Sequence, residues 1–333
     1  MTGAPAVLAV DIGATNTRVG LVDAEGKVLS FVTGKTPDGG DDPMEVVLRV
    51  KGMAEELLGP AGWEKAACIG ISGAGPVDRN RGSLIRPPNI PLPEVPLREP
   101  LAEWTDLPVT VLNDCHAGVI AERCYGAGKG CRDMVYLTLS TGIGAGVIMD
   151  DRLILGHEGN AAEVGHFHVD SELDLPCGCG YSGHWEGYAS GRFLPRFFTS
   201  WWGKDLSLLP FDPRTPEGIF SAAREGDRVA AAFLDRLAEI NGRGISDIIV
   251  AYNPELIVFD GSVVLKNSRE VVDRAVPRID RYLTLPRLAI THLRGNAPLI
   301  GAAVAARIAC RGKEISRIDF GDLCKAGDQG ICF

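Results

Sequence analysis

The sequence lacks any long apolar run. No stretch of about 18 consecutive apolar residues occurs, so we expect neither a transmembrane helix nor a membrane partner. The first five residues, MTGAP, also lack the basic and then apolar segments that form a secretion signal. The nine cysteines are odd in number and scattered, which favours reduced thiols over a disulfide framework. Together these absences predict a cytoplasmic protein.

Positive charge is scarce as well. The chain has 34 Lys and Arg against 43 Asp and Glu, which gives a formal net charge of −9 at pH 7. Because binding to a nucleic acid backbone needs a basic face, nucleic acid is not an expected partner. Low-complexity linkers are absent, and 45% of the 333 residues are hydrophobic. This composition is typical of one large or two modest globular domains.

A polar glycine turn follows the first apolar run of the chain. Its sequence is DIGATNTR at positions 11–18, and apolar residues resume directly afterwards, which predicts a β-hairpin. The backbone of the turn and the side chains of Thr15, Asn16 and Thr17 can hold phosphate oxygens. Asp11 can hold Mg²⁺ through water. An ordinary hairpin turn is the alternative, and no GxxxxGK[ST] P-loop is present.

A second glycine turn lies about 130 residues later. The sequence STGIGAG at 140–146 follows an apolar strand and precedes another. Glycines at alternate positions let the backbone approach a phosphate closely, although a plain β-turn is again the alternative. The two hairpins form a loose internal duplication, and together their turns favour a two-sided phosphate clamp.

Asn113 and Asp114 stand between an apolar strand and a predicted helix. A carboxylate at such a junction can project into a cleft and act as general base on a substrate hydroxyl. The alternative is a helix N-cap, a role that Asp and Asn often take, and the local sequence favours the cap.

Two short segments, EVGH at 163–166 and CGCGYSGHWE at 177–186, concentrate metal-binding residue types. Two cysteines and two histidines have the type and number of a closed zinc site, whereas buried thiols and a surface histidine are the alternative. Glu163 and Glu186 flank this set and can be held against a polyhydroxylated ligand. The other histidines are interpreted as ordinary polar residues. The four predicted ligands are His166, Cys177, Cys179 and His184.

The alternation of predicted strands and helices indicates an α/β protein with two lobes around a cleft. A proline-rich stretch at 81–100 is expected to form a long surface loop. Strands are predicted at 28–33, 67–72, 109–112, 134–140, 147–149, 256–259 and 289–291, and helices at 43–59, 117–125, 227–253 and 297–309.

With these motifs in this order, the sequence resembles the ROK family (repressors, open reading frames and sugar kinases) of the actin-like ATPase superfamily. The resemblance extends from about Val7 to Ala309 and adds GAGPVD at 73–78, SG at 190–191 and DGSV at 260–263. It implies a two-lobed actin-like ATPase (ribonuclease H-like) fold with an interlobe cleft. The expected small lobe comprises residues 1–112 plus about 298–333, and the large lobe, which carries the zinc knuckle, comprises 113–297.

The resemblance implies ATP-dependent phosphorylation of a hexose, most of all glucose, at its 6-hydroxyl. Asp114 then takes the proton of that hydroxyl. The sugar-binding residues are expected to be Gly75, Asn89, Asn113, Asp114, Glu163, His166 and Glu186, and His166 also binds a structural Zn²⁺. The residues expected to bind ATP and its Mg²⁺ are Asp11, Gly13, Ala14, Thr15, Asn16, Thr17, Thr141, Gly142, Gly261 and Ser262.

Other members of the family define the alternatives. These are kinases of N-acetylmannosamine, N-acetylglucosamine or fructose, and sugar-sensing regulators with a helix-turn-helix segment before the first turn. Only ten residues precede Asp11 and the chain is acidic, which favours the enzyme. Members are often dimers or tetramers, so a homo-oligomer is expected. The family usually has cysteine where His184 stands, so a Cys₂His₂ set here replaces Cys₃His and shifts the knuckle slightly.

Overall fold

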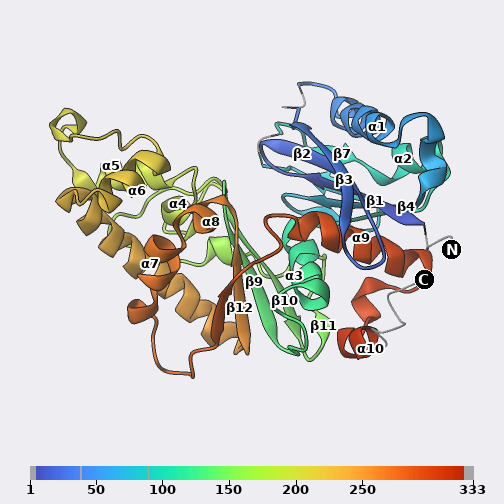
Figure 1. The fold of residues 1–333 in the computed structure, drawn as a ribbon. Coiled ribbons are helices and arrows are strands. Elements are labelled where there is room, and N and C mark those ends of the chain that lie inside the picture. Colours follow the sequence, from blue (N-terminus) through green and yellow to red (C-terminus); the bar gives the residue numbers. More distant parts are fainter. Residues whose placement is uncertain (1–4, 38–39, 89, 326–333) are drawn as a thin grey trace. The chain divides into compact units, whose positions relative to one another are not determined.

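The computed structural model describes residues 5–37, 40–88 and 90–325, and Figure 1 shows its ribbon. The α/β class predicted from the sequence is confirmed, and the chain divides into two compact units. The lobe boundaries expected from the resemblance remain a prediction. Unit 1 comprises Met1–Val135, Gly146–Ala162 and His292–Phe333, and unit 2 comprises Tyr136–Ala145 and Glu163–Thr291.

Unit 1 is built on a five-stranded sheet whose strand order is β3-β2-β1-β4-β8. Strands β1 and β2 form the predicted antiparallel hairpin, whereas β4 pairs in parallel with both β1 and β8. The hairpin register places Ile12 opposite Thr17, so the glycine turn is as short as the sequence indicates. The strands are β1 (Ala6–Ile12), β2 (Asn16–Val22), β3 (Val28–Lys35), β4 (Ala66–Gly73) and β8 (Val109–Asn113).

Helices cover both faces of this sheet (Figure 1). One apolar face packs with helix α1 (Met44–Leu58) and the other with α9 (Ala297–Cys310), because alternate strand residues point to opposite sides. Gly301 of α9 lies so close to the carbonyl of Ala117 that a Cβ there would collide with it. The small residues of α9 therefore serve close packing, as the sequence predicts. Helix α3 (Asp114–Tyr125) is the neighbour that α9 approaches.

The proline-rich stretch at 81–100 is not the irregular loop that we expected. Strands β5 (Val77–Asp78), β6 (Ser83–Ile85) and β7 (Glu94–Pro96) form a small antiparallel sheet in the order β5-β6-β7, and helix α2 (Arg98–Thr105) follows. Pro96 is tolerated because β7 is an edge strand, where a missing N–H breaks no ladder. Asn89, one of the predicted sugar-binding residues, lies outside the described residues.

The second five-stranded sheet has the order β11-β10-β9-β12-β13, and β12 pairs in parallel with β13. Strand β10 begins at Ile143, so the predicted turn at 140–146 was too long: only residues 140–142 form it. Gly146 lies inside the strand, where a Cβ would collide with the carbonyl of Cys115. The strands are β9 (Met134–Leu139), β10 (Ile143–Met149), β11 (Arg152–Leu153), β12 (Leu256–Asp260) and β13 (Arg287–Ile290).

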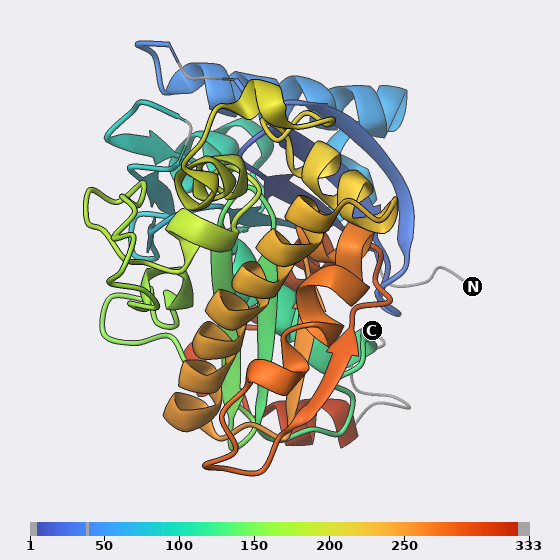
Figure 2. The same ribbon diagram turned by 90° about the vertical axis from the view of Figure 1, so that its left-hand side faces the viewer.

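The long helix α7 (Arg228–Tyr252) dominates the helical part of unit 2 (Figure 2). Asp227 caps its start by accepting hydrogen bonds from the N–H groups of Val229 and Ala230, and Asn253 ends it in a left-handed conformation. Within the described ranges, no helix combines the length and the apolarity needed to cross a bilayer. The other helices of this unit are α4 (Glu186–Ala189), α5 (Leu194–Trp202), α6 (Pro216–Arg224) and α8 (Ser262–Ser268).

Short helical turns complete the chain, and the last helix of unit 1 is α10 (Phe320–Lys325). Phe320 is fully buried, and its N–H donates to the carbonyl of Asp151, which anchors this end of unit 1. The turns are η1 (Gly59–Lys65), η2 (Val164–His166), η3 (Leu206–Leu208), η4 (Arg269–Asp273), η5 (Val276–Arg278) and η6 (Ile315–Arg317).

Candidate active site

The four predicted metal ligands come together in unit 2. One ligand atom from each residue lies within 4.8 Å of the others, which is the spacing of a single-ion site. Cys177 Sγ is 3.8 Å from His166 Nδ1, and Cys179 Sγ is 3.2 Å from His184 Nδ1. Two thiols and two imidazoles are the donor set of structural Zn²⁺. The geometry thus fits the metal that the sequence suggested, with His184 in the place of a cysteine.

A tight backbone turn positions the two cysteines. The N–H of Cys177 donates to the carbonyl of Tyr181 at 2.6 Å, and the N–H of Gly180 donates back to the carbonyl of Cys177. Gly180 has a φ of +93°, a conformation that residues with a Cβ rarely adopt. Glycine at this position therefore allows the chain to reverse between one ligand and the next.

Trp185 also anchors the segment 177–186, which carries three of the four predicted ligands and is called the knuckle here. This side chain is fully buried, and its indole N–H donates to Asn241 of α7 at 2.9 Å. The ring packs where Gly244 has no side chain. Because Trp185 stands between His184 and Glu186 in the chain, fixing it fixes both neighbours.

Electrostatics in the cluster suit a cation. Burial raises the pKa of the Cys177 thiol to about 11, so a nearby cation is needed to hold the thiolate at neutral pH. Burial, together with His166 and His168, lowers the pKa of His184 and favours its neutral form. Neutral imidazole is the form that ligates metal.

His166 faces two ways. Its Nδ1 points to Cys177, while its Nε2 is 4.0 Å from a carboxylate oxygen of Glu163. The side chains of His166 and Glu163 remain 37% and 45% exposed, so both are open to a ligand. Burial raises the pKa of Glu163 and the nearby Glu186 adds to the rise, whereas His166 opposes it. The double role of His166, in metal and sugar binding, stays a prediction.

Glu186 lies between the knuckle and the second glycine turn. Its Oε2 accepts a hydrogen bond of 3.0 Å from the N–H of Ile143, and its Oε1 is 4.0 Å from Cys177 Sγ. The expected role of Glu186 was sugar binding alone. Its contact with Ile143 was missed, because nothing in the sequence pairs positions that are 43 residues apart.

The second glycine turn is also joined by backbone hydrogen bonds to the segment that follows Glu186. The N–H of Gly191 donates to the carbonyl of Ser140 at 2.7 Å, and the N–H of Ser140 donates to the carbonyl of Gly142. Thr141 and Gly142, the predicted phosphate contacts, are half-buried at the tip of this turn.

The start of α3 shows which of the residues Asn113 and Asp114 caps the helix, while the role of Asp114 as general base stays a prediction. Asn113 is the cap: its Oδ1 accepts from the N–H groups of Cys115 at 2.8 Å and of His116 at 3.3 Å. Its Nδ2 donates to the carbonyl of Gly75 at 3.2 Å, so these two predicted sugar contacts are neighbours. Asp114 lies in the first turn, half-buried, where the helix N-terminus favours its charge.

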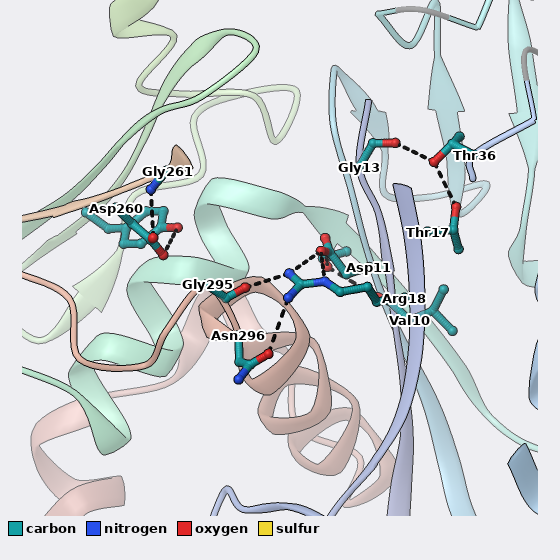
Figure 3. A network of polar contacts seen from close by, with 12 residues as sticks. Val10, Asp11, Gly13, Thr17, Arg18, Thr36, Asp260, Gly261, Gly295 and Asn296 are labelled. Atoms are coloured by element: carbon teal, nitrogen blue, oxygen red, sulfur yellow. Dashed lines mark hydrogen bonds and ion pairs between the residues drawn. The ribbon is translucent and has the colours of Figure 1, made fainter. Parts of the chain in front are cut away.

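The first glycine turn carries an ion pair at its base (Figure 3). Asp11 is buried, and its Oδ2 is 2.7 Å from Arg18 while its Oδ1 accepts from Ser72 at 3.0 Å. Arg18 also donates to the carbonyl of Gly295 and to Asn296. Both oxygens of Asp11 thus have partners inside unit 1. Arg18 belongs to the motif, yet its part in closing the turn was not predicted.

The tip of this turn is held by hydroxyl groups (Figure 3). The N–H of Gly13 donates to the carbonyl of Asn16, and Thr36 Oγ1 donates to the carbonyl of Gly13 at 2.7 Å. Thr17 is buried with its hydroxyl 3.0 Å from that of Thr36. The side chain of Thr17, one of the expected phosphate contacts, is therefore part of the turn's own support. Ala14, Thr15 and Asn16 form its more exposed part.

The turn that carries Gly261 and Ser262, both expected to bind ATP, joins β12 to α8 in unit 2. Gly261 has a φ of +94°, which favours glycine, and its N–H donates to Asp260 at 2.7 Å (Figure 3). The other oxygen of Asp260 accepts from the hydroxyl of Tyr136 at 2.9 Å. Ser262 then begins α8, so its backbone N–H stands at a helix start.

Comparisons with known proteins show which family the sequence is similar to. The sequence model described as the ROK family matches residues 7–308. The chain is 39% identical to a glucokinase of Pyrobaculum calidifontis over 83% of this chain and 86% of the relative. It is 35% identical to a glucokinase of Thermotoga maritima over 89% and 96%, respectively.

Among solved structures, a ROK family glucokinase from Streptomyces griseus, in complex with glucose and AMPPNP, matches with a TM-score of 0.76. That structure is 32% identical in sequence, and the match covers 91% of this chain and 99% of the other. On the family match across the chain and the identity of these relatives, the protein belongs to the ROK family.

Proposed function

We propose that this protein transfers the terminal phosphoryl group of ATP to the 6-hydroxyl of a hexose, with glucose as the preferred acceptor. The glucokinase relatives and the glucose- and AMPPNP-bound neighbour support this donor and acceptor. The observation that carries the proposal is the start of α3. Asn113 caps the helix, and Asp114 follows it as a half-buried carboxylate whose Oδ1 accepts from the N–H of Cys115 at 2.9 Å. A carboxylate at this position supports the role of general base that the motif implies.

Asp114 acts on the acceptor hydroxyl. It accepts the proton of the 6-hydroxyl as that oxygen bonds to the γ-phosphorus, while the bond from phosphorus to the β–γ bridging oxygen breaks. In phosphoryl transfer the protein takes little part in covalent chemistry. Orientation of the reactants and neutralisation of charge therefore supply most of the acceleration. The half-buried position of Asp114 at a helix N-terminus suits a group that must be ionised before it acts.

The sugar ring is held by acceptors and donors around the knuckle. Glu163 and Glu186 accept hydrogen bonds from ring hydroxyls, and His166 uses the nitrogen that faces away from Cys177. Asn113, whose Nδ2 donates to the carbonyl of Gly75, and Gly75 itself are further sugar contacts that the resemblance implies. Asn89 is proposed from the resemblance alone. The carboxylates of Glu163 and Glu186 make charge-assisted contacts and the amide of Asn113 is fixed by its bonds, which favours selection between sugar isomers.

The two glycine turns and the turn at Gly261 and Ser262 are proposed to bind ATP. Backbone N–H groups of Thr141 and Gly142 contact phosphate oxygens, as do those of residues 14–16, whereas Gly13 shapes the turn because its N–H donates to the carbonyl of Asn16. Mg²⁺ enters with ATP. Since Arg18 and Ser72 occupy the oxygens of Asp11, that residue suits a contact through water better than direct ligation.

The cluster of His166, Cys177, Cys179 and His184 is proposed to hold a structural Zn²⁺. When bound, this ion neutralises the two thiolates and locks the knuckle. The consequence for catalysis is indirect: a locked knuckle holds Glu163 and Glu186 in fixed positions for the sugar. The reaction uses ATP and the site needs reduced thiols, so we place the protein in the cytoplasm.

A coupled assay of ADP release tests the proposed function. The acceptor panel contains glucose, N-acetylmannosamine, N-acetylglucosamine and fructose, each with Mg²⁺-ATP. We expect the highest kcat/KM with glucose, and a phosphorylated product that is the 6-phosphate by NMR. Turnover of another sugar at higher kcat/KM would reassign the acceptor, and no turnover above ATP hydrolysis would refute the kinase. Light scattering on the same preparation tests the expected homo-oligomer.

A further inference from the structure

We propose that Glu186 couples the binding of sugar to the binding of nucleotide, through its hydrogen bond to the backbone of the second glycine turn. This inference rests on the proposed function, because it takes Glu186 as a sugar contact and residues 140–142 as a phosphate contact. It adds that the two events help each other. Glu186 is in this respect a positioning residue for the turn.

The contact between Glu186 and Ile143 depends on a glycine at position 142. Glu186 Oε2 is 3.0 Å from the N–H of Ile143, the first residue of β10 and the residue directly after the turn. A Cβ on Gly142 would lie 2.5 Å from the same oxygen, closer than a real Cβ comes to any atom. Only glycine at position 142 therefore leaves room for the carboxylate at this amide.

The turn does not depend on Glu186 alone. The N–H of Gly191 donates to the carbonyl of Ser140 at 2.7 Å, and the N–H of Arg192 donates to the carbonyl of Thr141 at 3.4 Å. These bonds are made by backbone, so a side-chain substitution at Glu186 leaves them in place. A variant at this position is thus expected to fold and to lose the hydrogen bond between the Glu186 carboxylate and the N–H of Ile143.

The positive sign of the coupling follows from the number of hydrogen bonds that one carboxylate can accept. Its two oxygens offer about four acceptor sites, and the bond to Ile143 uses one of them. Sugar hydroxyls can donate to the others and so restrict the carboxylate. A restricted carboxylate restricts the amide of Ile143 and the turn before it, which lowers the ordering cost of binding phosphates there. By linkage, nucleotide must then raise sugar affinity by the same factor.

Calorimetry of the intact protein measures this coupling without turnover. AMPPNP with Mg²⁺ is titrated in the absence of sugar and at saturating glucose, and the ratio of the two Kd values is the coupling factor. We expect a factor of about five or more for the wild-type chain, the lower end of typical allosteric couplings. A factor of one would overturn the proposal, whereas the proposed function is judged separately by ADP release.

Three variants assign the coupling to the contact. Glu186→Ala removes the acceptor, and Gly142→Ala displaces the carboxylate without removing it. Both are expected to bring the factor to about one. Glu163→Gln is the matched control, because the contact described for this neighbouring carboxylate is to His166 and not to the turn: glucose affinity falls while the factor stays.

The outcomes against the proposal are equally defined. A wild-type factor in Glu186→Ala at saturating glucose overturns it. If Glu186→Ala no longer binds glucose at any practical concentration, Gly142→Ala decides, because its Glu186 side chain is intact. The ratio of Kd values cancels any direct loss of nucleotide affinity in that variant. Circular dichroism and thermal unfolding confirm that each variant is folded.

Discussion

The two glycine turns resemble each other in sequence but are supported in different ways. The turn after β1 is held by Thr36, which donates to the carbonyl of Gly13, and by the pairing of Asp11 with Arg18 across the hairpin, and Arg18 also donates to Gly295 and Asn296. The turn before β10 is instead held through Glu186 and Gly191. None of the described bonds that hold the first turn comes from a proposed sugar contact, whereas the second turn depends on the segment that carries such contacts.

The two kinds of support suit different tasks in the proposed binding of phosphates. A turn whose supports are separate from the sugar contacts presents its backbone in one geometry whether or not a sugar is bound. A turn held by a sugar-binding carboxylate can respond to the sugar, because the same side chain has both partners. The comparison therefore predicts that ligand-dependent behaviour concentrates in the second turn, while stability depends more strongly on the first.

The largest effect is expected where both turns stay intact. Asp114→Asn removes the base but keeps the shape of the side chain, and Asn113 still caps α3. We expect kcat to fall by about 10²–10⁴, the usual contribution of a general base, with glucose affinity nearly unchanged. Steady-state kinetics and calorimetry measure the two quantities. A kcat within tenfold of wild type would exclude Asp114 as the base.

The next effect concerns the support of the first turn. Arg18→Met leaves the buried carboxylate of Asp11 without its cation, so the free energy of unfolding should fall by about 3 kcal/mol. Urea denaturation gives the value. The matched control is Arg214→Met, whose partner Asp212 is exposed, and it should leave the free energy of unfolding nearly unchanged. Equal losses in the two variants would contradict a special role for the ion pair.

Acid should weaken the unit that contains the first turn. His116 of α3 is 1% exposed, and burial lowers its pKa to about 4 from 6.5. Because the unfolded chain binds this proton more readily, the stability is fully present above pH 6.5 and is lost as the pH falls toward 4. The shift corresponds to about 3 kcal/mol at most.

Thermal and urea unfolding between pH 4 and 7 follow this loss. His116→Gln should flatten the dependence over that window, since glutamine does not titrate. The exposed His157 supplies the control, and His157→Gln should keep the wild-type slope. An unchanged slope in His116→Gln would assign the acid sensitivity to other groups.

Local patterns in the sequence predicted the elements of the fold well. The hairpin at the first turn, the capped helix from Arg228 to Tyr252 and the small-residue helix at the end of unit 1 all carry their signals within a few positions. Asp227 and Asn253 are examples, because a cap acts on backbone groups that are at most four residues away. Such short-range chemistry is visible in one sequence.

The parts that failed depend on distant partners. Strands β6 and β7 were missed because prolines suggest a loop, and only the edge position of β7 makes Pro96 acceptable. Gly146 was assigned to a turn because its reason, the close approach of Cys115, comes from another element. The ligand types of the metal cluster were visible, yet the bond from Glu186 to Ile143 was not.

Removing the metal is expected to have the smallest effect, because it acts on the second glycine turn indirectly. It first loosens the knuckle, and the loosened knuckle then supports the turn less well through Glu186. A chelator should release about one Zn²⁺ per chain, and the knuckle that carries Glu186 should loosen. We expect the KM for glucose to rise roughly tenfold, as is typical when the support of a metal-site residue is lost. Metal analysis, kinetics and hydrogen exchange measure the three effects.

Hydrogen exchange shows where the loosening reaches. Protection should fall at 177–186 and at the second turn, whereas the first turn, held by Thr36 and Arg18, should keep its protection. Cys179→Ser should reproduce the chelator's effect, and Cys310→Ser, an exposed thiol outside the cluster, should not. Fully active protein without zinc, or equal loss of protection at both turns, would remove the distinction between them.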